Sequence, residues 1–209
     1  MNKIDIRKIV TGPVQTNCYV VTSENRAIII DPGSEDEDIY EFLENKTLDY
    51  VFLTHSHYDH IDGVNSVLER FPEAELATHS LEKESLVSPE KNLSVFMGAS
   101  CSVKREVDIL LEDRSVLNWN NTEIEIIHTP GHTIGGVCFY LHEQKILFSG
   151  DTLFRNGVGR SDLPGGNHSV LMKSIREKLM NLPDDTDVYP GHMEKTTIGH
   201  EKKYNPYII

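Results

Sequence analysis

Short apolar segments separated by polar or glycine-containing turns recur along most of the chain. Their length and their content of β-branched and aromatic residues are typical of β-strands. The predicted strands are Ile4–Val10, Tyr19–Thr22, Ala27–Ile30, Tyr50–Leu53, Glu75–Thr78, Ile124–Ile127, Val137–Leu141, Lys145–Phe148 and Val188–Tyr189.

Apolar residues at helical spacing predict two helices, Ile61–Phe71 and Ser169–Leu182. Asn167 precedes the second of these and is a suitable N-cap. A further helix is expected after Ser34, which we interpret as an N-cap. The acidic run Glu35–Asp38 would then occupy the first turn, where the helix dipole favours negative charge.

Strands lie in both halves of the chain with helices between them. This order predicts an α/β (α+β) sandwich of packed sheets with outer helices. The segment 82–108 contains Pro89, Gly98 and several serines, and predicts loops with a short helix. A length of 209 residues is compatible with a single domain spanning 1–209.

The composition is that of a globular protein, with 38% hydrophobic and 25% charged residues. No apolar run approaches the roughly 20 residues that span a bilayer, and the start of the chain does not resemble a secretory signal. Three cysteines are too few for a disulfide scaffold. The formal net charge of -13 disfavours a broad nucleic-acid-binding face. We therefore expect a cytoplasmic protein that binds neither membrane nor nucleic acid.

Ten histidines are present, and three of them lie in the motif His55-Ser56-His57-Tyr58-Asp59-His60, directly after a predicted strand. Imidazole is the commonest metal ligand in proteins. Four donor side chains in six residues cannot all reach one tetrahedral ion without strain, but they can serve two adjacent ions. Histidine and carboxylate donors without thiolates fit Zn, Fe or Mn.

Three further turns follow predicted strands and present a donor, namely His132, Asp151 and His192. Donors at the same end of several strands can form one site on a rigid scaffold. The repeated layout makes each of the three far stronger as a candidate ligand than an isolated residue would be.

The motifs Thr54–His60, Thr129–Thr133, Gly150–Phe154 and Pro190–His192 resemble those of the metallo-β-lactamase superfamily. Within it they are most similar to the glyoxalase II (hydroxyacylglutathione hydrolase) group, in a single-domain form without the helical C-terminal glutathione-binding domain. The resemblance covers nearly the whole chain, and includes Asn17-Cys18-Tyr19 and the Ile30–Gly33 turn.

The resemblance implies an αββα sandwich with two divalent metal ions, Zn in the first instance and Fe or Mn as alternatives. One ion would be held by three histidines, the other by Asp59 and two histidines, with Asp151 bridging both. The implied ligands are His55, His57 and His132 for the first ion, and Asp59, His60 and His192 for the second.

The resemblance also implies the reaction. A metal-bound hydroxide, oriented by Asp59, would attack an acyl thioester of the S-lactoylglutathione type and release a hydroxy acid and a thiol. The partner is then a small-molecule thioester. Other activities of the same fold stay open: a mononuclear iron persulfide dioxygenase using His57, His132 and Asp151, a lactonase-type hydrolase or a β-lactamase.

Substrate-binding residues are suggested by position. Arg160 lies nine residues after Asp151, where a basic residue contacts the glutathione carboxylate in the two-domain glyoxalase II enzymes. It would bind an anion or form an ion pair with Asp162. Arg155 and Lys195 lie close to implied ligands in sequence and are further candidates.

Overall fold

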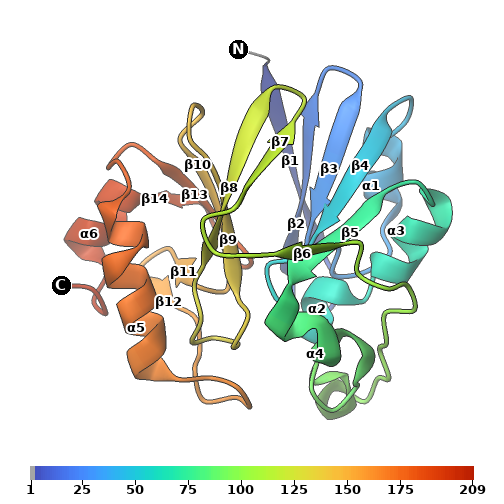
Figure 1. The fold of residues 1–209 in the computed structure, drawn as a ribbon. Coiled ribbons are helices and arrows are strands. Elements are labelled where there is room, and N and C mark those ends of the chain that lie inside the picture. Colours follow the sequence, from blue (N-terminus) through green and yellow to red (C-terminus); the bar gives the residue numbers. More distant parts are fainter. Residues whose placement is uncertain (1–2) are drawn as a thin grey trace. The chain divides into compact units, whose positions relative to one another are not determined.

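The computed structural model describes residues 3–209 (Figure 1). The chain divides into two compact units, Met1–Leu110 and Leu111–Ile209. The expectation of a single domain over residues 1–209 stays a prediction.

The first unit is built on a six-stranded sheet in the order β1-β2-β3-β4-β5-β6. The first three strands are antiparallel neighbours, whereas β3, β4 and β5 run parallel. The strands are β1 Ile4–Thr11, β2 Thr16–Ser23, β3 Arg26–Ile30, β4 Thr47–Phe52, β5 Glu75–His79 and β6 Ile109–Leu111.

Helices of the first unit follow its parallel strands, as the right-handed βαβ connection requires (Figure 1). Their apolar residues, such as Ile39 and Val67, share a buried core with the sheet residues Ile29 and Val51. The helices are α1 Glu37–Phe42, α2 Tyr58–Ile61, α3 Val64–Arg70 and α4 Lys83–Val87, with 3-10 turns at Ser80–Glu82 and Ser94–Met97.

The second unit contains a six-stranded sheet in the order β14-β13-β10-β9-β8-β7, in which only β10 and β13 are parallel. A separate two-stranded hairpin, β11 with β12, follows β10. The strands are β7 Val116–Trp119, β8 Thr122–His128, β9 Val137–Leu141, β10 Ile146–Gly150, β11 Leu153–Phe154, β12 Gly157–Val158, β13 Asp187–Pro190 and β14 Thr196–Thr197.

Two helices cover one face of this sheet, α5 His168–Glu177 and α6 Ile198–Tyr204, and a 3-10 turn at Leu179–Asn181 follows α5 (Figure 1). Leu171 and Ile175 of α5 share a buried core with Tyr140 and Leu147 of the strands. The side chain of Asn167 accepts a hydrogen bond from the Val170 amide, which confirms the predicted N-cap.

All nine predicted strands are present, and none of their bounds differs by more than three residues from the expected one. One helix expectation was wrong, and another was confirmed only in part. Asp36, not Ser34, caps α1, because its carboxylate accepts the Asp38 amide. Of the helix expected over Ile61–Phe71, α3 confirms Val64–Arg70. The helix does not run on from Ile61, because the Gly63 amide donates to the Pro32 carbonyl at 2.9 Å instead of to the preceding helical turn. A Cβ at Gly63 would lie 2.5 Å from the Ser34 carbonyl oxygen.

Candidate functional site

In the first unit, β4 leads directly into the turn that carries His55 and His57. Both side chains are buried, with 2% and 6% of their surface exposed. The Nε2 atom of His55 lies 3.2 Å from the Nδ1 atom of His57, and the two rings are nearly perpendicular. These two ring nitrogens therefore converge on one point from a rigid turn.

Asp31 controls which nitrogens of the neighbouring histidines remain available. Its buried carboxylate accepts hydrogen bonds from His60 Nδ1 at 2.9 Å and from the Thr54 hydroxyl at 2.6 Å. Because the Thr54 hydroxyl donates to Asp31, it accepts from His55 Nδ1, which lies 3.1 Å away. In both histidines the proton is thereby placed on Nδ1, and Nε2 keeps its lone pair for a metal ion.

Asp59 and His60 form a second pair of donors at the start of α2. The Oδ2 atom of Asp59 lies 3.5 Å from the Nε2 atom of His60 and accepts a hydrogen bond of 2.8 Å from the Thr16 hydroxyl. The chain around Asp59 is tightly confined, since a Cβ at Gly33 would lie 2.0 Å from the Asp59 carbonyl oxygen. Only glycine fits at that position.

A second buried carboxylate supports the turn that carries His55 and His57. Glu82, 1% exposed, accepts the backbone amide of Ser56 at 2.9 Å and also the Ser56 hydroxyl. Because Ser56 lies between His55 and His57, these bonds fix the backbone that presents both rings.

In the second unit, three separate turns bring His132, Asp151 and His192 together. One carboxylate oxygen, Asp151 Oδ2, lies 3.5 Å from His132 Nε2 and 3.6 Å from His192 Nε2. Asp151 follows β10 and His192 follows β13, the parallel pair of the sheet. The two turns are joined by a hydrogen bond from the Gly191 amide to the Gly150 carbonyl.

Main-chain contacts fix the orientation of these residues. The Nδ1 atom of His132 donates to the carbonyl of Arg160 at 2.7 Å, so the lone pair for a metal ion is on Nε2. Gly159 lies against Asp151, and a Cβ at Gly159 would lie 1.8 Å from the Asp151 carbonyl oxygen. The segment that orients His132 is thus packed directly on the backbone of Asp151.

The spacing of these atoms suits metal binding. Two ligands at 2.0–2.2 Å from a tetrahedral ion are separated from each other by about 3.4 Å. The four observed pairs lie within about 0.2 Å of that value, at 3.2, 3.5, 3.5 and 3.6 Å. The sharing of Asp151 Oδ2 between two histidines is what a bridging carboxylate requires. The donor sets of both units therefore fit divalent metal ions.

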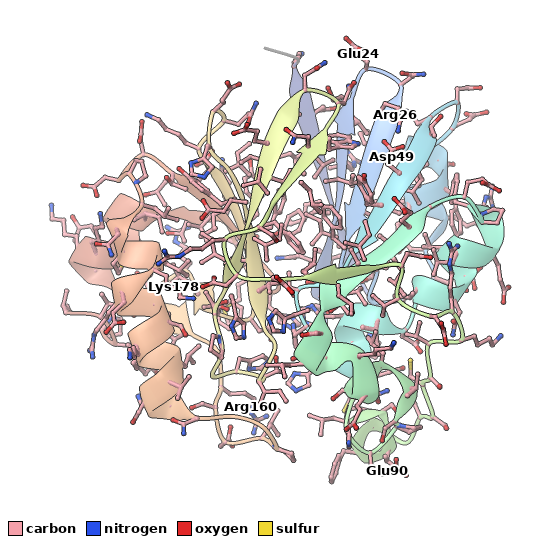
Figure 2. The ribbon with its side chains drawn as sticks, in the orientation of Figure 1. Glu24, Arg26, Asp49, Glu90, Arg160 and Lys178 are labelled. Atoms are coloured by element: carbon pink, nitrogen blue, oxygen red, sulfur yellow. The ribbon has the colours of Figure 1, made fainter. Side chains whose placement is uncertain are left out.

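The three candidate substrate residues differ in their surroundings. Arg160, on the loop that precedes α5 (Figure 2), makes a two-pronged ion pair with Asp162, with both nitrogen–oxygen distances 2.8 Å. This ion pair lowers the pKa of Asp162 to about 2. Arg155 and Lys195 instead line a common cavity of the second unit. Whether any of them binds substrate stays a prediction.

The cysteine thiols are unsuited to act as nucleophiles. All three are buried and free. Burial raises the pKa of Cys101 to about 12 and that of Cys138 to about 11, and it also raises the pKa of Cys18. They remain protonated at neutral pH.

The supporting residues Asp31, Thr16 and Glu82 were not predicted. Asp31 was interpreted as part of a turn before a helix, although it directly follows an apolar strand, as the candidate ligands do. Its position at the end of a strand could have identified Asp31 as a residue of the site. Thr16 and Glu82 carry no such signal.

Among the helices of residues 3–209, none has the length and apolar character needed to cross a membrane.

A family model described as "Metallo-beta-lactamase superfamily" matches residues 11–192. The chain is 35% identical to hydroxyacylglutathione hydrolase GloC of Haemophilus influenzae, with 98% of each protein covered. It is 36% identical to the crystal structure of BLEG-1 B3 metallo-beta-lactamase, with a TM-score of 0.92, covering 98% of this chain and 99% of that one. It is 32% identical to TTHA1623 in a di-iron-bound form, with a TM-score of 0.84, covering 96% and 99%.

Proposed function

Because the chain belongs to the metallo-beta-lactamase superfamily, we propose that it is a dinuclear hydrolase that cleaves an acyl thioester. The expected fold class is confirmed: it has the mixed α/β fold of the superfamily, with sheets flanked by helices. Membership supports a metal-dependent hydrolase. The similarity to GloC supports a substrate of the S-lactoylglutathione type, whose products are a hydroxy acid and a thiol.

Seven donors are proposed to hold two divalent metal ions. His55, His57 and His132 would bind one ion, and Asp59, His60 and His192 the other, with Asp151 shared. The family match extends over all seven residues, and the relative with two bound iron ions supports a pair of metals. Zn is our first choice and Fe or Mn the alternatives, since histidine and carboxylate donors accept all three.

Divalent ions bound in this way lower the pKa of water and polarise a carbonyl oxygen. The protein contributes position. Thr16 holds the Asp59 carboxylate, which would orient the attacking water, and Asp31 keeps Nε2 of His55 and His60 unprotonated. The observation that carries the proposal is the sharing of Asp151 Oδ2 between His132 and His192.

The test is the Asp151→Ala variant, compared with the original protein and with Asp185→Ala, which removes an exposed carboxylate paired with Lys145. We expect Asp151→Ala to lose at least one of two bound metal ions and nearly all hydrolysis of S-D-lactoylglutathione. Metal content is measured by elemental analysis and hydrolysis by thiol release, before and after treatment with a chelator. Full activity with unchanged metal content in Asp151→Ala would disprove the dinuclear proposal.

The similarity to the B3 metallo-beta-lactamase favours a second candidate, hydrolysis of a β-lactam. Both substrates have an acyl carbon that water attacks, and they differ in the leaving group, a thiol or a ring amine. A chromogenic cephalosporin assayed beside the thioester separates them. Faster turnover of the cephalosporin would replace the thioester proposal, and oxygen consumption with a persulfide would instead indicate the iron dioxygenase alternative.

A further inference from the structure

A cavity of about 420 Å³ lies in the second unit, between one face of α5 and the last residues of the chain. Ser169, Lys173 and Arg176 line it at helical spacing, and Tyr207 lines it from the end of the chain. None of its lining residues is a candidate metal ligand or a candidate substrate residue. Its volume is in the range of roughly 300–1,000 Å³ that is typical of small-molecule sites.

The other side of α5 is attached to the turn between β8 and β9. At the start of the helix, the Asn167 amide donates to the Gly131 carbonyl, and further along the Ser174 hydroxyl donates to the Pro130 carbonyl, both at 2.8 Å. At 3.6 residues per turn, Ser174 is about 160° around the helix from Arg176. The wall that α5 contributes to the cavity is therefore held in place from behind.

The opposite wall is held by the buried side chain of Asn205. This side chain donates to the Gly157 carbonyl at 3.0 Å and to the Glu201 carboxylate at 2.8 Å, and it accepts the Tyr207 amide at 3.0 Å. The Tyr207 carbonyl in turn accepts a hydrogen bond of 3.2 Å from the guanidinium of Arg176. The two walls are thus bonded to each other, and the Tyr207 side chain lines the cavity while it is 51% exposed.

The lining carries a positive charge. Arg176 has no carboxylate partner among residues 3–209, and the Lys173 ammonium lies 4.0 Å from the Glu177 carboxylate, with both side chains more than 60% exposed. Such an exposed ion pair is weak and is readily rearranged by an incoming anion. With Glu177 counted, the lining has one net positive charge, in a chain whose formal net charge is -13. An unpaired guanidinium is well suited to bind a phosphate.

The same cavity also offers apolar and aromatic surface. Met172, 6% exposed, lines it beside the two cations, and Tyr207 supplies a ring of the kind on which nucleobases stack. We propose that the cavity binds a nucleoside monophosphate, with its base against Tyr207 and Met172 and its phosphate at Lys173 and Arg176. One net positive charge favours a single phosphate over a chain of two or three. This site is independent of the proposed thioester hydrolysis.

The first experiment titrates the zinc-loaded protein with AMP, adenosine and inorganic phosphate, and follows ¹³C-labelled methionine methyl groups by NMR. Of the five methionines, Met172 lines the cavity and Met193 lies beside the candidate ligand His192. We expect the Met172 signal to shift saturably with AMP, at lower concentrations than with adenosine or phosphate. No shift of Met172, a shift confined to Met193, or equal affinities for AMP and phosphate would overturn the proposal.

The second experiment tests the contribution of the base with Tyr207→Ser, using Tyr204→Ser as the matched control. Tyr204 is 54% exposed, close to the 51% of Tyr207, but does not line the cavity. We expect Tyr207→Ser to weaken AMP binding about tenfold, within the range measured for loss of one base–aromatic stack. Tyr204→Ser should leave the affinity for AMP unchanged. An equal loss in both variants, or none in Tyr207→Ser, would contradict the assignment.

The third experiment tests the phosphate contact with Lys173→Met. Lys203→Met is the control, because it removes an exposed cation of α6 that lies over the Tyr204 ring and outside the cavity. We expect Lys173→Met to weaken AMP binding about threefold, as for loss of one exposed ion pair, and to leave adenosine binding unchanged. The same weakening in Lys203→Met would indicate a general effect of net charge and would refute a phosphate site at Lys173.

Discussion

The two units present the same kind of donor side chain by different means. In the first unit, four candidate ligands come from the single segment 55–60, and the buried side chains of Asp31, Thr16 and Glu82 hold them. In the second, three ligands come from separate turns, held by the Arg160 carbonyl and by glycine contacts. The first arrangement should be sensitive to hydrogen-bonding chemistry, and the second to backbone space.

The largest effect is expected from adding one methyl group in the second unit. In Gly159→Ala the new Cβ would overlap the Asp151 carbonyl oxygen, 1.8 Å away, and would approach His132 Nδ1 to 3.4 Å. The backbone must move, so we expect a loss of about 3 kcal/mol of stability, the upper range for overpacking. For a chain of this size that lowers Tm by roughly 6–12 °C, measured by calorimetry on metal-free protein.

Gly157→Ala, two residues earlier in the chain, is the matched control. Its new Cβ would have no neighbour closer than 3.7 Å, and Gly157 does not have a positive φ. We expect its Tm to stay within about 2 °C of the original protein, as for an ordinary surface substitution. Equal losses in the two variants would show that the close packing on Asp151 does not constrain this unit.

In the first unit, the chemistry of one oxygen should matter more than space. Asp31→Asn keeps the size and shape of the side chain. An amide has one oxygen instead of two, so one of the hydrogen bonds that the carboxylate accepts from His60 and Thr54 is lost. His60 is then driven to the tautomer with its proton on Nε2, which cannot bind a metal ion. We expect a 10–100-fold loss of metal affinity, the usual effect of removing such a partner.

The measurement is a metal titration, with ¹⁵N chemical shifts of the His60 ring in the metal-free protein as a direct report of the tautomer. Asp36→Asn is the control, because Asp36 caps α1 and asparagine caps a helix equally well. Unchanged metal affinity and an unchanged His60 tautomer in Asp31→Asn would remove the distinction between the two units.

The same contrast explains what could be predicted from the sequence. Strand positions could be predicted because the alternating or continuous apolar residues that become buried lie within the sequence of each strand. The break between α2 and α3 was missed, because the apolar period continues through Gly63. The reason for the break is the hydrogen bond from the Gly63 amide to the Pro32 carbonyl, a contact made only on folding. The Ser34 cap failed similarly, since Asp36 competes two residues later.

For the site, donor residues were predictable because their spacing and their position after strands are local properties. Their supports were not, because Asp31 contacts His60 across 29 residues and Glu82 contacts Ser56 across 26. Short strands such as β14 and the two-residue strands of the β11–β12 hairpin were also missed, since they contain too few residues to show a period. The cavity lined by Arg155 and Lys195 is formed partly by these short strands, and for the same reason it was not predicted.

The smallest effect concerns the ion pair of Arg160 with Asp162, which distinguishes Arg160 from Arg155. Its hydrogen bonds lower the pKa of Asp162 from an ordinary value of 3.8 to about 2. A lowered pKa means that the pair's contribution to stability is present above about pH 4 and is lost as pH falls towards 2. NMR titration of the Asp162 carboxyl carbon should therefore give a midpoint near 2, returning towards 3.8 in Arg160→Met. Arg155→Met should leave that midpoint in place. A midpoint near 3.8 in the original protein would mean that Arg160 is not held by Asp162 in solution and is available to bind an anion.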